Sequence, residues 1–205
     1  SFSYALTEEA VFADTALNSK VANCHRAPAS CFRKELLETN AIIEMLNHCI
    51  VEIRQLNPDL QIIFTISPVR HIRDGVVENN RSKARLIEAV HQIVSSVENT
   101  YYFPAYELVI DVLRDYRFYD IDLVHPNYAA SSFVLEKFTD TCIAEESRVL
   151  MKEIRQIINA RKHRPLQPGT QAHRQFLAQS LEKVYQLQQQ YPYLNWTEEL
   201  IYFSN

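Results

Sequence analysis

Glycine is scarce in this chain. Its 205 residues include two glycines, Gly75 and Gly169, whereas average usage of about 7% would give roughly fourteen. The phosphate loops of P-loop and Rossmann nucleotide-binding proteins need several closely spaced glycines, because their backbone turns tightly against the phosphates. The shortage therefore argues against nucleotide chemistry.

Long apolar runs and an excess of one charge are also missing. No apolar run approaches the length of a membrane span, and a formal net charge of −4 gives no support for a nucleic-acid partner. The four cysteines show no close metal-ligand spacing, and we expect Cys49, within an apolar helical pattern, to be a buried thiol. An apolar fraction of 47% is typical of a soluble globular protein.

Helical and strand patterns alternate through the middle of the chain. The predicted elements are a helix at 40–56, a strand at 60–66, a helix at 81–97, a strand at 101–103 and a helix at 106–115. The strand at 60–66 is nearly continuously apolar, which suits a parallel sheet buried on both faces. The alternation predicts a doubly wound α/β sheet, in which ligands bind beyond the C-terminal ends of the strands.

The flanking segments are less regular. We expect a short strand at 1–6, a helical turn at 32–37 and a polar loop at 69–80. After Pro126 the pattern is helical, with a break near Ala144, a basic linker at 161–169, a helix at 170–190 and an aromatic tail. The tail is expected to pack on the domain or on a partner, and the C-terminal helices are candidates for forming a homo-oligomer. We therefore divide the chain into an α/β domain, 1–145, and a helical extension, 146–205.

Asp122 and His125 stand three residues apart, directly before Pro126. Proline is favoured at the first position of a helix, so we expect His125 at or beside the N-cap, where the helix dipole favours the neutral imidazole. The carboxylate can hold the other ring nitrogen, which gives the orienter and base of a catalytic triad. A surface Asp beside a helix-capping His has the same pattern. Three polar segments predicted to leave strands at one edge, 23–26, 67–71 and the loop up to His125, favour the triad interpretation.

Other polar residues near these strand ends have two interpretations each. Asn23 is either an amide donor to a developing oxyanion or a loop Asn bonded to its own backbone, and His25 is either a site residue or a structural His. Ser67 precedes a proline at the end of a predicted strand, so a turn is its favoured interpretation. Arg70 and His71 suit an anionic or carbonyl substrate, or Arg70 braces its loop through Asp74. Ion pairs that position the 122–125 loop are the favoured interpretation of three further residues, Arg114, Asp115 and Arg117, and the basic linker residues Arg161 to Arg164 are expected to be solvated.

Several short motifs occur together and in order between residues 21 and 138. They are Ala22-Asn23-Cys24-His25-Arg26-Ala27-Pro28, Ser67-Pro68-Val69-Arg70-His71, Glu78-Asn79-Asn80-Arg81-Ser82-Lys83-Ala84, Tyr102-Phe103-Pro104-Ala105-Tyr106-Glu107, Leu113-Arg114-Asp115-Tyr116-Arg117-Phe118-Tyr119 and Asp122 to Asn127. In this combination the chain resembles the GSCFA family, a bacterial group related in fold to the SGNH/GDSL hydrolases. The resemblance implies an SGNH-like three-layer parallel sheet with helices on both faces and a serine-dependent hydrolase site. It also implies Asp122 as orienter, His125 as base and Asn23 as oxyanion donor.

The chain departs from the family pattern in two places. The motif that names the family, which holds the nucleophilic serine near the N-terminus, is absent, and we interpret Ser30-Cys31-Phe32 as a coincidence. The Gly-Thr pair expected before the Asn-Cys-His segment is also missing, since the chain reads Phe2-Ser3-Tyr4-Ala5 there. We expect either a C-terminal portion of a longer protein or a divergent member without its nucleophile, with Ser67 as the internal serine to test.

The leading hypothesis is a hydrolase that acts on an ester, with an acylated carbohydrate as one candidate substrate and no metal or cofactor required. Its nucleophilic serine is expected outside this chain. A non-catalytic binding or assembly module is the alternative. A phosphate-ester enzyme that uses Arg70 is less favoured, because no metal-ligand cluster is evident in the sequence. The compartment stays open, with the cytoplasm favoured.

Overall fold

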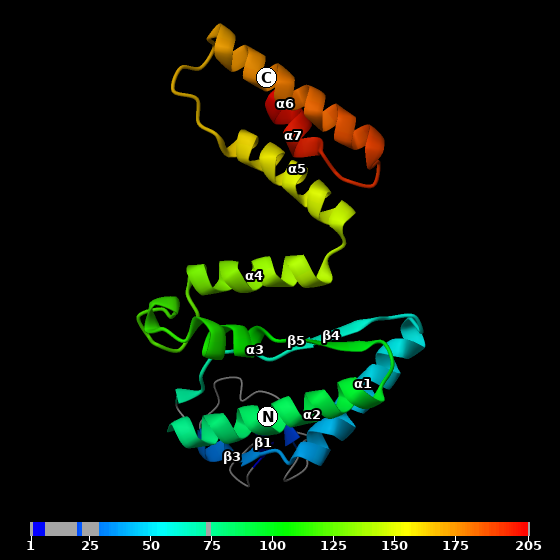
Figure 1. Ribbon diagram of the computed structural model, residues 1–205, viewed down its shortest axis with the longest axis vertical. Helices are drawn as coiled ribbons and strands as arrows, with labels where there is room; N and C mark the ends of the chain where they lie inside the picture. Colours follow the sequence, from blue (N-terminus) through cyan, green and yellow to red (C-terminus); the bar gives the residue numbers. More distant parts are fainter. Residues whose placement is uncertain (1, 7–19, 22–28, 73–74, 205) are drawn as a thin grey trace. The chain divides into compact units, whose positions relative to one another are not determined.

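The computed structural model describes residues 2–6, 20–21, 29–72 and 75–204 (Figure 1). The chain divides into two compact units, Ser1–Lys137 and Phe138–Asn205. Asn23, His25 and Asp74 lie outside the described residues, so the predictions made for them stay predictions.

The N-terminal strands of the first unit form an antiparallel sheet. The central strand is β1 (Phe2–Leu6), which confirms the strand predicted at 1–6, and it pairs with β2 (Lys20–Val21) and β3 (Phe32–Leu36). A 3₁₀ turn, η1 (Ala29–Cys31), leads into β3. The predicted helical turn at 32–37 is therefore wrong. All five residues of β3 take part in the pairing with β1, and the side chains of Arg33 and Glu35, on the same face of the strand, form an ion pair of 2.8 Å.

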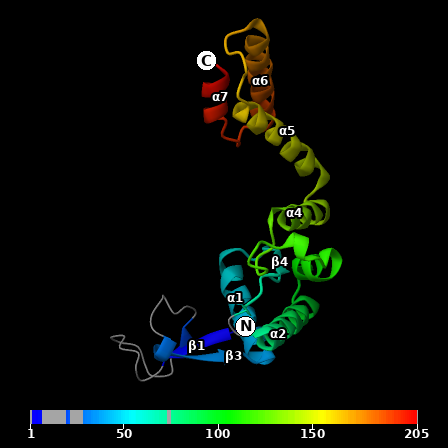
Figure 2. The same cartoon turned by 90° about the vertical axis from the view of Figure 1, so that its left-hand side faces the viewer.

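A parallel β-α-β unit follows. Strand β4 (Ile62–Thr65) pairs in parallel with β5 (Thr100–Phe103), and α2 (Gly75–Ser96) connects them. Helix α1 (Thr39–Leu56) precedes β4 and packs against α2 (Figures 1 and 2). This order confirms the predicted alternation of helix and strand. The parallel sheet has two strands in the part of the chain that the structure describes, so the α/β character is established and the three-layer SGNH-like sheet stays a prediction.

Burial in this unit differs from the sequence prediction. Strand β4 was expected to be buried on both faces, but Ile63 is 43% exposed and its neighbour Tyr101 on β5 is 47% exposed. In α1, Ile42 and Ile50 are buried, whereas Leu56 is 89% exposed. The thiol of Cys49 is exposed as well, so its prediction as a buried cysteine is wrong. Apolar or β-branched character in these two elements therefore does not by itself mark a buried side chain.

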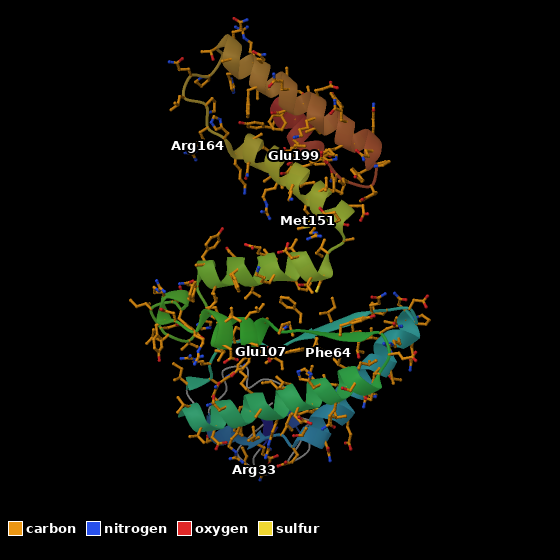
Figure 3. All side chains as sticks on the ribbon, in the orientation of Figure 1. Arg33, Phe64, Glu107, Met151, Arg164 and Glu199 are labelled. Atoms are coloured by element: carbon orange, nitrogen blue, oxygen red, sulfur yellow. The ribbon has the colours of Figure 1, made fainter. Side chains whose placement is uncertain are left out.

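The chain between β5 and the second unit changes its helical winding three times. It forms α3 (Ala105–Glu107), the π-helical η3 (Leu108–Leu113), the 3₁₀ turn η4 (Tyr116–Phe118) and α4 (Tyr128–Cys142). The predicted helix at 106–115 is thus confirmed in position, with π winding in its second half. The Tyr102 hydroxyl of β5 donates to the Glu107 carboxylate at 2.8 and 3.0 Å, which ties α3 to the sheet. Glu107 is labelled in Figure 3.

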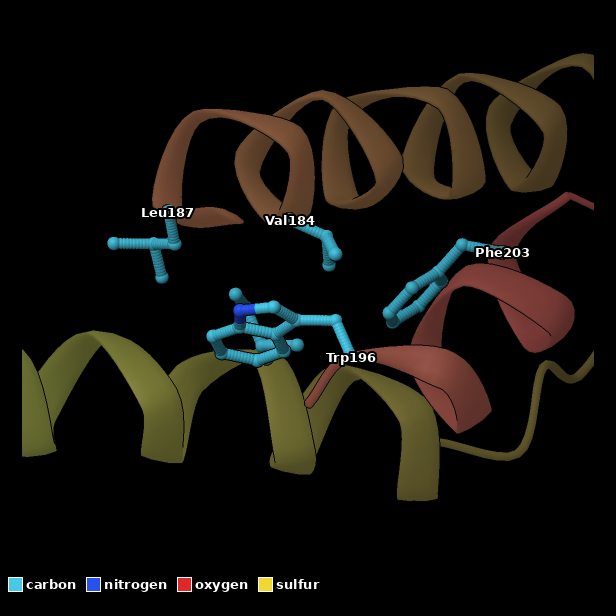
Figure 4. Close-up of a cluster of buried hydrophobic side chains, with 5 residues drawn as sticks. Val184, Leu187, Trp196 and Phe203 are labelled. Carbon is cyan, nitrogen blue, oxygen red and sulfur yellow. The ribbon is translucent and has the colours of Figure 1, made fainter. Parts of the chain in front are cut away.

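The second unit is helical. It contains α5 (Glu145–Lys162), α6 (Gln171–Gln190) and α7 (Thr197–Phe203), and the break between α4 and α5 at 143–144 confirms the predicted one. The tail packs on this unit, because Trp196 and Phe203 are buried against α5 and α6 (Figure 4). Arg161 pairs with Glu198 and, at 3.1 Å, with Glu199. The prediction of a solvated Arg161 is therefore wrong.

Candidate functional site

The loop that carries Asp122 and His125 is closed by its own backbone. Tyr119 and Pro126 form an antiparallel bridge, and the amide of Asp120 donates to the carbonyl of His125 at 2.8 Å. One residue further out, the amide of Asn127 donates to the carbonyl of Phe118 at 2.9 Å. Leu123 lies at the tip with a φ of 55°, in the left-handed region. These contacts hold residues 118–127 as a small hairpin.

The Asn127 side chain joins this hairpin to α4. Its amide nitrogen donates to the carbonyls of Arg117 at 2.6 Å and Tyr119 at 3.3 Å, and its amide oxygen accepts from the amide of Ala130 at 3.2 Å. Asn127 is therefore the N-cap, and α4 begins at Tyr128. The prediction that Pro126 opens the helix, with His125 at or beside the N-cap, is wrong, because the cap lies two residues after His125. Because a helix dipole acts within its first turn, it has little influence on His125.

Asp122 and His125 form the pair expected of an orienter and a base. Oδ2 of Asp122 lies 2.7 Å from Nδ1 of His125, while Oδ1 accepts from the backbone amides of Val124 at 2.9 Å and His125 at 3.0 Å. The hydrogen bond from the His125 ring, followed by those from the two amides, lowers the pKa of Asp122 to about 2. An ionised Asp122 favours the tautomer with the proton on Nδ1, which leaves Nε2 as the acceptor.

Both side chains of the pair are open to solvent. The exposed fractions are 59% for His125 and 44% for Asp122. Among the residues that the structure describes, none forms a hydrogen bond with Nε2 of His125. The proton acceptor is therefore oriented and accessible, and the described residues supply no hydroxyl already bonded to it.

The loop after β4 lies against this hairpin. The backbone amide of Arg70 donates to the carbonyl of Val124 at 3.4 Å. The Arg70 guanidinium reaches the hydroxyl of Tyr119 at 3.5 Å and stacks over its ring, with Cζ 4.7 Å from the centroid. Two of the three segments predicted to converge, 67–71 and the His125 loop, are thus in contact.

Helix α2 anchors both ends of the 67–71 loop with polar side chains. Lys83 is buried and donates from Nζ to the carbonyl of Ser67 at 2.5 Å, and one turn earlier the Oδ1 atom of the buried Asn79 accepts from the amide of His71 at 2.9 Å. Burial lowers the pKa of Lys83. We refer to Asn79 and Lys83 as the α2 clamp. Asn79 lies in the segment predicted to be a loop, 69–80, and Lys83 lies in the predicted helix at 81–97, where only apolar side chains were expected to face inward. Two polar residues at i and i+4 inside a family motif were the available signal.

Ser67 and His71 are placed by these contacts rather than by contact with His125. The Oγ atom of Ser67 accepts from the amide of Val69 at 3.2 Å, as expected of a serine that makes a turn. His71 is exposed. No group of three or more His, Cys, Asp or Glu side chains suited to a metal ion occurs within the described ranges. None of the helices described there has both the length and the apolarity to cross a membrane.

Comparisons with known proteins point to one family. The model of the GSCFA family matches residues 4–138, and the model described as the C-terminal domain of the GSCFA domain protein matches residues 154–205. The first match contains the hairpin, the 67–71 loop and the α2 clamp. No curated protein and no solved structure matches the chain.

Proposed function

Because the chain belongs to the GSCFA family, we propose that it carries the base and orienter of a serine hydrolase that cleaves an ester. In this proposal residues 1–145 form an SGNH-like hydrolase domain and 146–205 its helical extension. The observation that carries the proposal is the 2.7 Å contact between Asp122 Oδ2 and His125 Nδ1, with Oδ1 of the same carboxylate held by two backbone amides.

The reaction would be an acyl transfer in two steps. A serine hydroxyl attacks the ester carbonyl while Nε2 of His125 takes its proton, and the imidazolium then returns that proton to the departing alcohol. Water, activated by the same nitrogen, releases the acyl group. Asp122 holds the imidazole through Nδ1 and stabilises its positive charge. Asn23 is the proposed donor to the oxyanion. The nucleophilic serine lies outside the described residues in this proposal, because no described hydroxyl is bonded to His125.

The substrate in this proposal is a small-molecule or carbohydrate ester. The exposure of both members of the pair supports a substrate that approaches from solvent. Arg70 is the proposed substrate-binding group of the neighbouring loop, since its backbone contacts the hairpin at Val124. His25, Ser67 and His71 keep lesser proposed roles in substrate binding.

Fluorophosphonate labelling of the full-length protein tests the proposal. We expect the unmodified protein to be labelled, and His125→Ala to be labelled at least about a thousandfold more slowly, because the nucleophile loses its base. His48→Ala is the matched control, since it removes an exposed His from α1. Ser67→Ala should be labelled like the unmodified protein. Equal labelling of the His125→Ala and His48→Ala variants would disprove the role of His125.

A binding module without catalysis is the second candidate. It is favoured by the open Nε2 atom of His125, which has no described hydroxyl partner. A correctly folded full-length protein that is not labelled under any condition would support this candidate over the hydrolase. Loss of labelling in Ser67→Ala alone would instead identify Ser67 as the nucleophile.

A further inference from the structure

A small pocket opens beside the hairpin. It has a volume of about 120 Å³ and is lined by Arg70, Ile110, Arg114, Asp115, Tyr116 and Tyr119. We call it the arginine pocket. Its lining comes from the 67–71 loop, from η3 and from the turn that follows η3. Tyr119 also pairs with Pro126, the residue after His125, so the pocket and the Asp122–His125 pair are built on the same loop.

The charges around the arginine pocket are unbalanced. Neither Arg70 nor Arg114 forms an ion pair with any residue in the described part of the chain. The carboxylate of Asp115 is already engaged, because it accepts from the Arg117 amide at 2.8 Å and pairs with the Arg117 guanidinium at 3.2 Å. The predicted ion pairs of this segment thus include Asp115 and Arg117 but leave Arg114 out. The guanidinium groups of Arg70 and Arg114 line the pocket, and the negative charge of Asp115 is neutralised by Arg117, so the pocket keeps a net positive charge.

The aromatic rings fix how Arg70 is presented. Its Cζ atom lies 4.7 Å from the ring centre of Tyr119 and 6.0 Å from that of Tyr116. A guanidinium stacked on a ring keeps its N–H groups at the edge, where they can donate in its plane. Tyr119 is itself buried, so the stacking surface is held in place. This arrangement suits a flat or tetrahedral acceptor with two oxygen atoms to offer.

The backbone at Arg114 is held in an unusual conformation. Arg114 has a φ of 48° and ends the π-helical η3, where its amide donates to the carbonyl of Val109 at 3.3 Å. Left-handed backbone at a non-glycine residue other than Asn or Asp is uncommon, and both it and π winding are concentrated at functional sites. A glycine or asparagine would fit this position with less strain, so the structure retains an arginine here at a cost.

We infer that the arginine pocket binds a small oxyanion, a carboxylate or phosphate group, and that this group belongs to the substrate of the hydrolase. The second part rests on the proposed function, whereas the first does not. The acyl ester would thus carry a negative charge at one end, which Arg70 and Arg114 hold while His125 acts at the ester. The two fork-shaped donors together with a volume of this size select a single oxyanion group rather than a large polyanion.

Anion binding is tested first, without reference to catalysis. Full-length protein labelled with ¹⁵N is titrated with sodium acetate and with sodium phosphate at constant ionic strength, and the arginine side-chain signals are followed by NMR. We expect saturable shifts at Arg70 and Arg114, with the tighter anion identifying the group. Arg114→Asn suits the left-handed backbone and should weaken binding at least about tenfold. Arg164→Gln, which removes the same charge from the loop after α5 (Figure 3), should leave binding unchanged. Shifts that do not saturate, or that weaken equally in both variants, would overturn the inference.

The link to the substrate is tested with a pair of esters. The neutral p-nitrophenyl butyrate is compared with the mono-p-nitrophenyl ester of succinic acid, which carries a carboxylate. We expect the unmodified protein to prefer the charged ester in kcat/KM, Arg114→Asn to lose that preference at least about tenfold, and Arg164→Gln to keep it. A protein that is labelled by fluorophosphonate but shows no preference would refute the substrate class alone. A protein that binds acetate or phosphate at the pocket but is never labelled would refute the hydrolase and leave the anion site.

Discussion

The two units of this protein keep their shapes by different means. In the second unit, apolar faces of α5 and α6 enclose Trp196 and Phe203 (Figure 4). Around α2 in the first unit, the buried polar side chains Asn79, Ser82, Lys83 and Thr100 lie beside apolar ones, whereas Glu199 is the one buried polar residue among those described in the second unit. Apolar packing is general and tolerant, whereas polar contacts fix single atoms. The candidate site therefore belongs to the unit in which hydrogen bonds hold the loops in place.

The largest change in stability is expected in the apolar core of the second unit. Trp196 is 4% exposed and contacts the core formed by Ile157, Val184 and Phe203. We expect Trp196→Ala to lower the free energy of unfolding of the second unit by about 3–5 kcal/mol, because it leaves a large cavity. Urea unfolding followed by circular dichroism measures the loss.

A second variant sharpens this prediction. The Nε1 atom of Trp196 is buried and has no hydrogen-bond partner among the described residues. Trp196→Phe removes that unsatisfied donor and keeps most of the apolar contact, so it should cost much less than Trp196→Ala. If both substitutions lower the free energy of unfolding equally, Trp196 does not stabilise the unit by filling space. The description of this unit as an apolar core would then be wrong.

A smaller effect is expected where the hairpin meets α4. Asn127→Ala removes the N-cap and the two donors to the carbonyls of Arg117 and Tyr119. We expect a loss of about 1–3 kcal/mol in the first unit. Asn127→Ser should lose less, since it keeps a capping oxygen and places no carboxylate against the two carbonyls. Hydrogen exchange at Asn127 and Ala130 measures the local loss, while the fluorescence of Trp196, the single tryptophan, reports on the second unit. Equal shifts in both signals would show that the two units unfold together and would break the comparison.

The same division explains what the sequence could predict. Apolar periodicity located α1, α5 and α6 closely, whereas the tail, expected to pack on the domain or on a partner, packs on α5 and α6. The periodicity located α2 from residue 81 onward but missed its first turns, which begin at Gly75 and have the polar Asn79 as their buried residue. A pattern that assigns polar residues to solvent interprets such a segment as loop.

The Asp122–His125 pair of the candidate site was predictable from the sequence, but the contacts that hold its loop in place were not. Asp122 and His125 were identified by their spacing and by the family resemblance, and the structure places them 2.7 Å apart. The position of the N-cap was missed by two residues, since Pro126 pairs with Tyr119 and Asn127 takes the capping role. Side chain–backbone contacts such as those of Asn127 and Lys83 depend on which loops meet, and a single sequence does not record that.

A substitution at Lys83 is expected to change the placement of the 67–71 loop while changing stability little. Lys83→Met keeps the length of the side chain, removes a buried charge and leaves the Ser67 carbonyl without its donor. We expect the free energy of unfolding to change by no more than about 1 kcal/mol, because these terms oppose each other, while the fluorophosphonate labelling rate falls. Since burial lowers the pKa of Lys83 in the folded protein, the unmodified protein should gain stability relative to Lys83→Met as the pH rises towards about 10.5.

Lys83→Arg separates placement from charge. It keeps a donor that can reach the Ser67 carbonyl, so labelling should recover at least in part. If the Lys83→Met variant is labelled as fast as the unmodified protein, the α2 clamp does not position the site. The first unit would then depend less on polar contacts than is argued above.

The smallest effect is expected at the exposed pair itself, where no burial contributes. Asp122 has a folded-state pKa of about 2, below its ordinary value of about 3.9, so the stabilisation that it gives the hairpin is present above about pH 4 and is lost as the pH falls through about 2. The carboxyl ¹³C signal of Asp122 measures this titration directly. In His125→Ala the pKa should rise but stay below 3.9, because the amides of Val124 and residue 125 still donate to Oδ1. Titration near 3.9 in the unmodified protein would mean that the pair does not form in solution. The order of this loop would then have to come from packing, as it does in the second unit.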